Sequence, residues 1–297
     1  MPDVLQNLSD ELAALTEQVS VSVVRVEARR RLPASGTVWD KGVVVTANHV
    51  VERDDDIHIG LPDGNRLSAK LVGRDPLSDI AVLRAEFDLP VPLWTTPETA
   101  RVGQLVLALG RPSRHIMATL GVISALETGD QLPRGIQVDH FLQTDVVMYP
   151  GFSGGALISA NGRVLGINTS AMRGISLTIP TSTIRRVVEA LLKHGKIQRG
   201  YLGVGAQAIK LSPAITAKVG QSYGLLVASV EPDSPAEQGG VLIGDILLRF
   251  NEMALSSPED LLRGLQSDCI GKTVPIVIVR GGELQTLQVT VGERLMR

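Results

Sequence analysis

The sequence predicts a mostly β protein with a larger strand-rich domain and a smaller domain of mixed strands and short helices. Its 297 residues suffice for two domains, since one domain usually takes about 100–200 residues. Between residues 20 and 180, short runs rich in Val and Ile alternate with turn residues, a pattern typical of a barrel or a sandwich. Residues 201–297 alternate strand patterns with short helical ones, which predicts an α+β unit.

The apolar runs of the first domain are each short enough for one strand, and turn signals separate them. The expected strands are Val21–Val26, Gly42–Thr46, Ile80–Leu83, Leu105–Leu109 and Val164–Ile167. The expected turns are 62–65 (Pro-Asp-Gly-Asn), Asp75-Pro76, Gly129-Asp130 and Asn161-Gly162.

A helix is expected on each side of this strand-rich region. In residues 3–19, apolar side chains recur every three or four positions, which predicts an amphipathic helix packed on its own domain or used as an oligomer contact. These side chains are Leu5, Leu8, Leu12, Leu15 and Val19. The second helix is expected to be capped by Thr181 or Ser182 and stopped by Gly195.

A short polar connector at residues 195–200 predicts the domain boundary. The expected division is an N-terminal helix (1–20), a first domain (21–195) and a second domain (196–297). In the second domain we expect strands at Leu225–Val230, Ile246–Phe250, Val274–Val279 and Leu287–Val291. The helices expected there are Pro213–Val219, Pro235–Gln238 and Pro258–Leu265.

Composition excludes several classes of function. Lys plus Arg number 29 and Asp plus Glu 31, so the formal charge of −2 argues against a protein that coats nucleic acid. Aromatic residues are too few for a base-stacking platform. The single cysteine, Cys269, allows neither an internal disulfide nor a cysteine zinc cluster.

The sequence as written predicts a cytoplasmic protein. No run of 18 apolar residues is present, and residues 1–20 carry acidic residues without Lys or Arg, unlike a secretory signal. If a leader has been removed, a periplasmic or other extracytoplasmic location is expected instead.

The segment from Gly151 to Gly155, Gly-Phe-Ser-Gly-Gly, is the strongest candidate for chemistry. Glycines let the chain turn tightly and expose the Ser153 hydroxyl, and the N–H groups of Gly151 and Ser153 can converge as an oxyanion hole. A phosphate-binding loop would need a Lys that is absent. An α/β-hydrolase elbow would need an acid and then a His downstream, where only Glu189 and His194 are present, on one helix.

The order His…Asp…Ser favours a third interpretation, a catalytic triad of His49, Asp79 and Ser153. His49 ends an apolar strand, and Asp79 begins another. The remaining histidines, His58, His115 and His140, lack metal-ligand spacing and are interpreted as solvated loop residues. The basic triplet Arg29-Arg30-Arg31 is interpreted as a solvated turn.

In combination these motifs resemble the HtrA (Deg) family of trypsin-like serine proteases. The resemblance is carried by Thr46–Val50, Asp75–Leu83 and Gly151–Leu157, and also by Gln143-Thr144-Asp145 and Ile179-Pro180. It implies a chymotrypsin-like double β-barrel and a serine endopeptidase that cleaves unfolded or misfolded proteins, after an apolar residue, without metal or cofactor. For the specificity pocket we expect Met148 together with Ala171, Met172, Arg173 and Gly174.

Residues 201–297 resemble the PDZ domain that follows the protease in this family. Tyr201, Leu202, Gly203 and Val204 match its carboxylate-binding loop, and residues 229–236 match a second motif. The resemblance implies binding of peptide C-termini. It also allows a homo-oligomer, although the N-terminus lacks the aromatic residues with which many members form trimers.

Two positions depart from the family pattern, where Phe152 replaces Asn and Ala156 replaces Pro. A bulky Phe152 beside the nucleophile is expected to reshape the pocket or the oxyanion loop. This departure motivates a second hypothesis, a peptide-binding or holdase protein whose protease site is poorly formed or inactive at rest.

Overall fold

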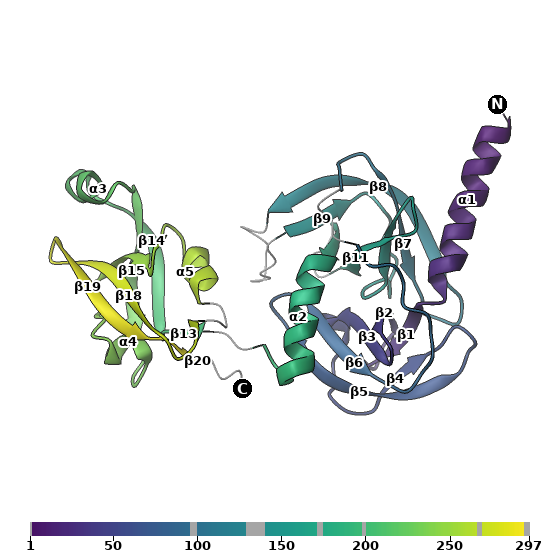
Figure 1. Ribbon diagram of the computed structural model, residues 1–297, viewed down its shortest axis with the longest axis horizontal. Helices are drawn as coiled ribbons and strands as arrows, with labels where there is room; N and C mark the ends of the chain where they lie inside the picture. Colours follow the sequence, from purple (N-terminus) through teal and green to yellow (C-terminus); the bar gives the residue numbers. More distant parts are fainter. Residues whose placement is uncertain are drawn as a thin grey trace. The chain divides into compact units, whose positions relative to one another are not determined.

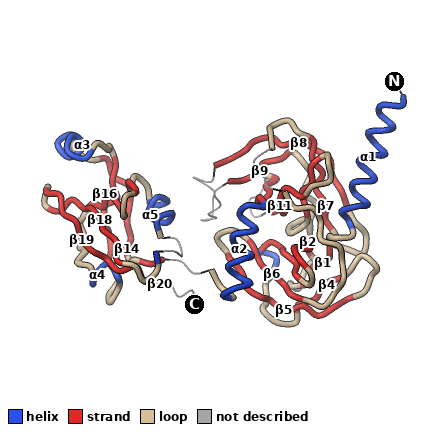
Figure 2. Tube along the Cα trace, in the orientation of Figure 1, coloured by secondary structure: helices blue, strands red, loops and turns tan. Residues whose placement is uncertain are grey.

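The computed structural model describes residues 2–95, 100–128, 140–170, 175–197, 200–265 and 269–293. The chain divides into two compact units, Met1–Ile197 and Gln198–Arg297. Strands dominate both units, and the first unit contains two closed six-stranded antiparallel barrels, so the expected mostly β fold is confirmed (Figures 1 and 2).

The first barrel is formed by the N-terminal strands in the order β1-β2-β3-β6-β5-β4. These strands are β1 (Val23–Glu27), β2 (Ala34–Asp40), β3 (Val43–Ala47), β4 (Ile57–Gly60), β5 (Arg66–Asp75) and β6 (Ile80–Arg84). Alternate side chains such as Val24, Val26 and Ile59 point inward and are fully buried, as the period of two in a strand requires. Residues 62–65 form the expected turn between β4 and β5.

The second barrel has the order β10-β11-β12-β9-β8-β7. Its strands are β7 (Leu105–Gly110), β8 (Met117–Thr128), β9 (His140–Thr144), β10 (Ala156–Ser159), β11 (Val164–Thr169) and β12 (Ser176–Pro180). Asn161 and Gly162 connect β10 to β11 as expected, with Gly162 at a φ of +73°. The expected turn at Gly129-Asp130 lies outside the described residues.

Helix α2 (Thr181–His194) packs across both barrels and joins their cores (Figure 1). Its buried face, which includes Ile184, Val188 and Leu191, shares one apolar cluster with Val45 of β3 and Ile179 of β12. The two barrels therefore form one body around a common core.

The expected N-cap of α2 is wrong, whereas the expected stop is confirmed. Pro180 is the N-cap residue, and the Thr181 hydroxyl donates to the carbonyls of Val164 and Leu165 instead of capping the helix. Gly195 ends α2 in the left-handed conformation, with a φ of 70°.

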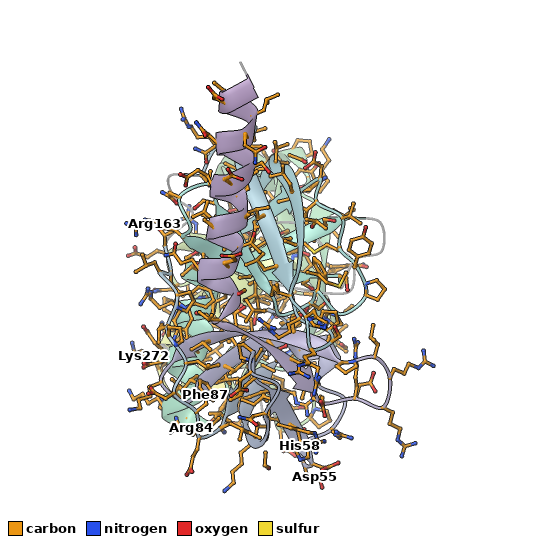
Figure 3. The ribbon with its side chains drawn as sticks, turned by 90° about the vertical axis from the view of Figure 1, so that its right-hand side faces the viewer. Asp55, His58, Arg84, Phe87, Arg163 and Lys272 are labelled. Atoms are coloured by element: carbon orange, nitrogen blue, oxygen red, sulfur yellow. The ribbon has the colours of Figure 1, made fainter. Side chains whose placement is uncertain are left out.

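Helix α1 (Pro2–Ser20) runs beside the second barrel and packs on it through only its C-terminal half (Figure 3). Leu12, Leu15 and Val19 join the apolar cluster of β7, β10 and β11. Leu5 and Leu8 are 73% and 44% exposed, so the apolar face expected for residues 3–19 is buried only in part.

The buried Arg111 joins the end of α1 to the barrels. Its guanidinium donates hydrogen bonds to the carbonyls of Ser20, Val23 and Arg114. Burial lowers the pKa of Arg111 from its ordinary value. The cation at the last carbonyl of α1 also opposes the partial negative charge of the helix terminus.

The second unit contains a six-stranded antiparallel sheet, in which five strands follow the order β14-β15-β16-β18-β19 and the short β17 pairs with β16. A separate two-stranded sheet is formed by β13 and β20. The strands are β13 (Gly200–Tyr201), β14 (Val204–Lys210), β15 (Tyr223–Val230), β16 (Ile246–Phe250), β17 (Met253–Ala254), β18 (Thr273–Arg280), β19 (Glu283–Thr290) and β20 (Gly292–Glu293). The helices are α3 (Pro213–Val219), α4 (Pro235–Gln238) and α5 (Pro258–Gly264). Strand β14 lies at an edge of this sheet.

An ion pair between a buried carboxylate and a partly exposed arginine supports the second unit. Asp245 is 1% exposed, and Arg280 donates to its two oxygens from Nε at 2.8 Å and Nη2 at 2.7 Å. The Leu242 N–H adds a bond of 2.8 Å. Burial alone would raise the pKa of Asp245, but these hydrogen bonds and the guanidinium charge hold it below its ordinary value.

This pair predicts an acid-sensitive second unit. Because the folded state lowers the pKa of Asp245, the stabilisation is present above the unfolded-state pKa of about 3.9 and is lost as pH falls through the lower folded value. Arg280→Met should destabilise the second unit at pH 7. It should also reverse the contribution of Asp245 to the pH dependence of stability, because a buried carboxylate without its cation has a raised pKa.

Hydrogen exchange of β16 and β18 peptides against pH, in the full chain, measures this effect. Tryptophan fluorescence is the internal control, because Trp39 and Trp94, the only tryptophans, lie in the first unit. Equal pH dependence of β18 exchange in the wild type and in Arg280→Met would contradict the prediction.

Candidate active site

His49 lies directly after β3, on the short 3-10 helix η1 (Asn48–Val50), and faces Asp79 at the start of β6. The His49 Nδ1 atom is 2.8 Å from Asp79 Oδ2 and 3.0 Å from Oδ1. The backbone also joins the two residues, since the His49 N–H donates to Asp79 Oδ1 at 2.8 Å. The adjacent pairing of β3 and β6 explains why two residues 30 positions apart meet here.

The Asp79 carboxylate is buried and held in one orientation. Only 3% of Asp79 is exposed, and its Oδ2 accepts a hydrogen bond of 2.6 Å from the Thr169 hydroxyl of β11. The φ of Asp79 is +55°, an unusual conformation for a residue other than glycine, and the Asn48 N–H fixes it by donating to the Asp79 carbonyl. A carboxylate held this way favours the His49 tautomer that carries its proton on Nδ1.

Ser153 lies in a tight loop before β10 whose shape requires its glycines. Gly151 and Gly154 have φ values of +93° and +86°. A Cβ atom at Gly154 would overlap the Ser35 carbonyl, and one at Gly155 would overlap the Leu109 carbonyl. The close approach of three backbone segments therefore explains these glycines.

Strand β2 of the first barrel anchors this loop of the second barrel, residues 151–155, which we call the serine loop. The Ser35 hydroxyl donates to the Gly151 carbonyl at 2.7 Å, and the Ser35 N–H donates to the Ser153 carbonyl at 3.1 Å. The Thr37 hydroxyl adds a bond of 3.0 Å to the Gly154 carbonyl. These bonds fix Ser153 relative to the barrel that carries His49 and Asp79.

Two backbone donors of the serine loop are unused. Among the residues that the structure describes, the N–H groups of Gly151 and Ser153 donate to no acceptor, whereas the Phe152 N–H donates to Tyr149. Gly151 and Ser153 are the two residues expected to form an oxyanion hole, and their N–H groups are available to an oxygen of a bound ligand.

The Ser153 hydroxyl is bound to Ser170 and not to His49. The two Oγ atoms lie 2.9 Å apart, and the Ser170 N–H donates to Ser153 Oγ at 3.3 Å. Within the described part of the chain, Ser153 makes no hydrogen bond to His49. The structure thus joins His49 and Asp79 directly and leaves the nucleophile-to-base contact unformed.

This arrangement predicts that Ser170→Ala raises the reactivity of Ser153. Without the competing hydroxyl, Ser153 loses a hydrogen bond worth about 1 kcal/mol, so its reaction rate with a fluorophosphonate should rise about fivefold. Ser176→Ala, which removes a hydroxyl bonded to the Val146 carbonyl in the same cavity, is the matched control. An unchanged or slower reaction of Ser170→Ala would contradict the prediction.

Phe152 was expected to reshape the pocket or the oxyanion loop, but its side chain does not line the cavity beside Ser153. It is 1% exposed and packs in the core of the second barrel, with its ring 5.8 Å from that of Tyr149 in an edge-on contact. Gly110 accommodates the ring, because a Cβ atom at that position would crowd Phe152. The bulky side chain therefore contributes to the core behind the serine loop.

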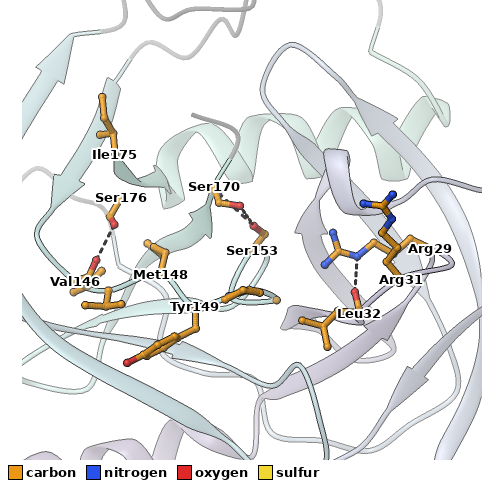
Figure 4. A pocket seen from close by; sticks show the side chains of 13 residues that line it. Arg29, Arg31, Leu32, Val146, Met148, Tyr149, Ser153, Ser170, Ile175 and Ser176 are labelled. Carbon is orange, nitrogen blue, oxygen red and sulfur yellow. Dashed lines mark hydrogen bonds between the residues drawn. The ribbon is translucent and has the colours of Figure 1, made fainter. Parts of the chain in front are cut away.

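A cavity of about 640 Å³ opens beside Ser153 (Figure 4). It is lined by Arg29, Arg31, Leu32, Val146, Val147, Met148, Tyr149, Pro150, Gly151, Ser153, Ser170, Ile175 and Ser176. Met148 lies where a pocket residue was expected. The other expected pocket residues, Ala171, Met172, Arg173 and Gly174, lie outside the described residues.

The expected carboxylate loop, Tyr201 to Val204, connects β13 to the edge strand β14. Gly203 has a φ of +80°, and its carbonyl accepts from the Glu231 N–H. In the described residues, the N–H groups of Leu202 and Gly203 donate to no acceptor. Helix α5 contacts β14, so the loop lies at one end of a strand edge flanked by a helix.

Sequence reasoning missed several residues that shape this site. Thr169 and Ser170 follow an apolar strand in the run Asn-Thr-Ser, and nothing in that run indicated contact with Asp79 or Ser153. Ser35 and Thr37 lie on β2, a strand that the sequence did not predict, and they anchor the serine loop from the other barrel. His58 and His140, interpreted as loop residues, instead lie on the strands β4 and β9 (His58 is labelled in Figure 3).

Family models match most of the chain in two parts. A trypsin-like peptidase domain matches residues 34–167, and a PDZ domain matches residues 200–291. Among curated proteins, a "probable periplasmic serine endoprotease DegP-like" of Halomonas elongata is 36% identical over 275 residues, covering 90% of this chain and 57% of that protein. A protein of the same name from Marinomonas is 38% identical, with 90% and 58% covered.

Solved structures show the same likeness. The HtrA-type protease AlgW bound to a tripeptide aligns with a TM-score of 0.81 and 32% identity, covering 96% of this chain and 98% of that one. The serine endoprotease from Yersinia pestis aligns with a TM-score of 0.78 and 32% identity, covering 94% and 97%. The chain spans a little over half the length of the curated relatives named above.

These relatives give no support to the cytoplasmic location expected from the sequence, because their names call them periplasmic. Within the described residues, no helix is long and apolar enough to cross a membrane.

Proposed function

The chain belongs to the HtrA (Deg) family of trypsin-like serine proteases, and we propose that it is an endopeptidase that cleaves unfolded polypeptides through His49, Asp79 and Ser153. One observation supports this proposal above the others. A buried carboxylate holds a histidine Nδ1 at 2.8 Å, and hydrogen bonds between the barrels fix a serine loop relative to this pair. A solvated histidine would need neither feature.

Acyl transfer begins when the Ser153 hydroxyl turns from Ser170 toward His49. Ser153 Oγ attacks the scissile carbonyl while His49 Nε2 takes the hydroxyl proton, and His49 later gives that proton to the leaving amine. Asp79 keeps the proton on Nδ1 and stabilises the imidazolium that forms. The N–H groups of Gly151 and Ser153 hold the oxyanion, each worth on the order of 10²–10³ in rate.

The cavity suggests how substrate is selected. Met148, Val146 and Ile175 form an apolar wall beside Ser153, which suits an apolar side chain immediately before the scissile bond. Such side chains are usually buried in folded proteins and become accessible when a protein unfolds. The expected substrates are therefore unfolded or misfolded proteins.

For the second unit we propose binding of peptide C-termini. The N–H groups of Leu202 and Gly203 would hold the terminal carboxylate, and the peptide would pair with the free edge of β14. We also propose that the protein works in the periplasm, in keeping with the names of its relatives.

A holdase remains the second candidate function, because the Ser153 hydroxyl is bound to Ser170 instead of His49. In that case the protein binds unfolded chains without cutting them. A peptide with an apolar C-terminus would distinguish a resting protease from a holdase by raising turnover.

Degradation of casein by the full chain tests the proposed function. The endopeptidase should release casein fragments from internal positions. If its site is inactive at rest, an added peptide with an apolar C-terminus should raise the rate of that release. Casein that is bound but stays intact, with and without the peptide, would favour the holdase.

A further inference from the structure

The cavity beside Ser153 has an apolar end and a basic end (Figure 4). Val146, Met148 and Ile175 lie on one side of Ser153, whereas the guanidinium groups of Arg29 and Arg31 lie on the other. Among the described residues that line it, none has an acidic side chain. A ligand that spans the cavity therefore meets an apolar wall on one side of the nucleophile and positive charge on the other.

The basic end has a fixed place relative to Ser153. Arg29 and Arg31 lie in the short loop that connects β1 to β2, and Ser35 of β2 donates its N–H to the Ser153 carbonyl. Arg29 is half-buried, and its Nε donates to the Leu32 carbonyl at 2.6 Å. This bond uses Nε and leaves the two terminal nitrogens available to a ligand.

Neither arginine is neutralised by a carboxylate in the part of the chain that the structure describes. In the described residues, Arg29 and Arg31 make no ion pair, although the neighbouring Arg25 and Arg66 are both paired with Glu27. Arg30 and Arg31 are both exposed, but only Arg31 of these two is among the residues that line the cavity. The triplet interpreted as a solvated turn thus presents two of its three cations to the site.

The course of a substrate follows from the proposed function, on which this inference rests. If the apolar wall takes the side chain before the scissile bond, the acylated half of the substrate lies over that wall. The leaving half must then continue past Ser153 toward Arg29 and Arg31. Residues that follow the scissile bond are therefore the ones that meet the basic end.

We propose that Arg29 and Arg31 are specificity-determining residues that favour acidic side chains in the first positions after the scissile bond. A guanidinium and a carboxylate form charge-assisted, often bidentate hydrogen bonds, which are stronger than neutral ones. The preferred substrate is an extended polypeptide with an apolar residue followed, across the cut bond, by Asp or Glu. Lys or Arg in these positions is disfavoured by charge repulsion.

Three quenched fluorescent peptides test this proposal with the full chain. They share one apolar residue before the scissile bond and carry Asp-Glu, Ser-Gln or Lys-Arg after it. Each has an amidated C-terminus, so the loop from Tyr201 to Val204 has no carboxylate to bind. We expect kcat/KM for the acidic peptide to exceed that for the neutral one about tenfold at low salt, and the preference to shrink in 0.5 M NaCl, added to screen the charges.

Substitutions assign the preference to the two arginines. In Arg29→Gln/Arg31→Gln the ratio of acidic to neutral kcat/KM should fall to about one. In Arg29→Glu/Arg31→Glu the order of acidic and basic peptides should reverse. Arg30→Gln is the matched control, since it removes the same charge from the same loop outside the cavity, and its ratio should equal that of the wild type.

A binding measurement separates failure of this inference from failure of the proposed function. Fluorescence anisotropy compares the acidic and basic peptides on Ser153→Ala, with and without Arg29→Gln/Arg31→Gln. If no peptide is cut by the wild type but Ser153→Ala binds the acidic one more tightly through these arginines, the endopeptidase fails and the basic subsite stands. The inference would be overturned if the acidic and basic peptides bound with equal affinity or were cut with equal kcat/KM. It would also be overturned if Arg30→Gln removed the preference as fully as Arg29→Gln/Arg31→Gln does.

Discussion

Replacing Ser153 by Ala is expected to reduce casein cleavage by the full chain by on the order of 10⁴-fold or more. Alanine keeps the backbone of the serine loop and removes the only atom that can form the acyl intermediate. The two carbonyls that Ser35 binds at Gly151 and Ser153 remain in place, so the loop should keep its shape. The measurement is the initial rate of fragment release, with hydrogen exchange of residues 150–160 to confirm an unchanged loop.

Ser68→Ala is the matched control for this experiment. Ser68 is an exposed serine on β5 that does not line the cavity at Ser153. The Ser68→Ala variant should cleave casein at the wild-type rate. Cleavage by Ser153→Ala within tenfold of the wild type would show that another group performs the reaction.

Replacing Asp79 by Asn is expected to lower kcat by about 10⁴-fold with the fold intact. The Asp79 carboxylate accepts hydrogen bonds from the His49 N–H, from His49 Nδ1 and from the Thr169 hydroxyl. An amide has a single acceptor oxygen and an NH₂ group, so it would turn a donor toward Nδ1 and favour the tautomer with the proton on Nε2. That tautomer cannot accept the Ser153 proton.

Asp63→Asn provides the comparison, since Asp63 accepts the Asn65 N–H in an exposed turn of the same barrel. This substitution removes one carboxylate that lies outside the site, and the variant should keep the wild-type kcat. If Asp79→Asn retained more than a tenth of the wild-type kcat, Asp79 would be a structural residue of the turn before β6 and not a catalytic one.

Local sequence patterns predicted the strands whose own residues form an apolar run bounded by turn residues. Valine and isoleucine runs bounded by turn residues indicated β3, β6, β7 and β11 closely, because buried barrel strands need apolar side chains. Strand β14 was missed because it lies at a sheet edge and none of its residues is buried, so its sequence lacks a continuous apolar run.

Contacts between distant segments could not be predicted from local patterns. The spacing of His49, Asp79 and Ser153 indicated their order, but the hydroxyl bond from Thr169 depends on how β11 meets β6 in space. The orientation of Phe152 depends on the space left by Gly110 on another strand. Likewise, Arg29 and Arg31 line the cavity in a loop that leads into β2, the strand whose Ser35 N–H donates to the Ser153 carbonyl.

The most direct test of the account is covalent labelling of the wild-type chain by a fluorophosphonate, with the modified residue located by mass spectrometry. A serine activated by His49 and Asp79 should be labelled at Ser153 alone, and Ser153→Ala should remove the label. No labelling of a folded wild-type chain, with or without a C-terminal peptide, or labelling that persists in Ser153→Ala, would contradict the assignment of Ser153 as the nucleophile.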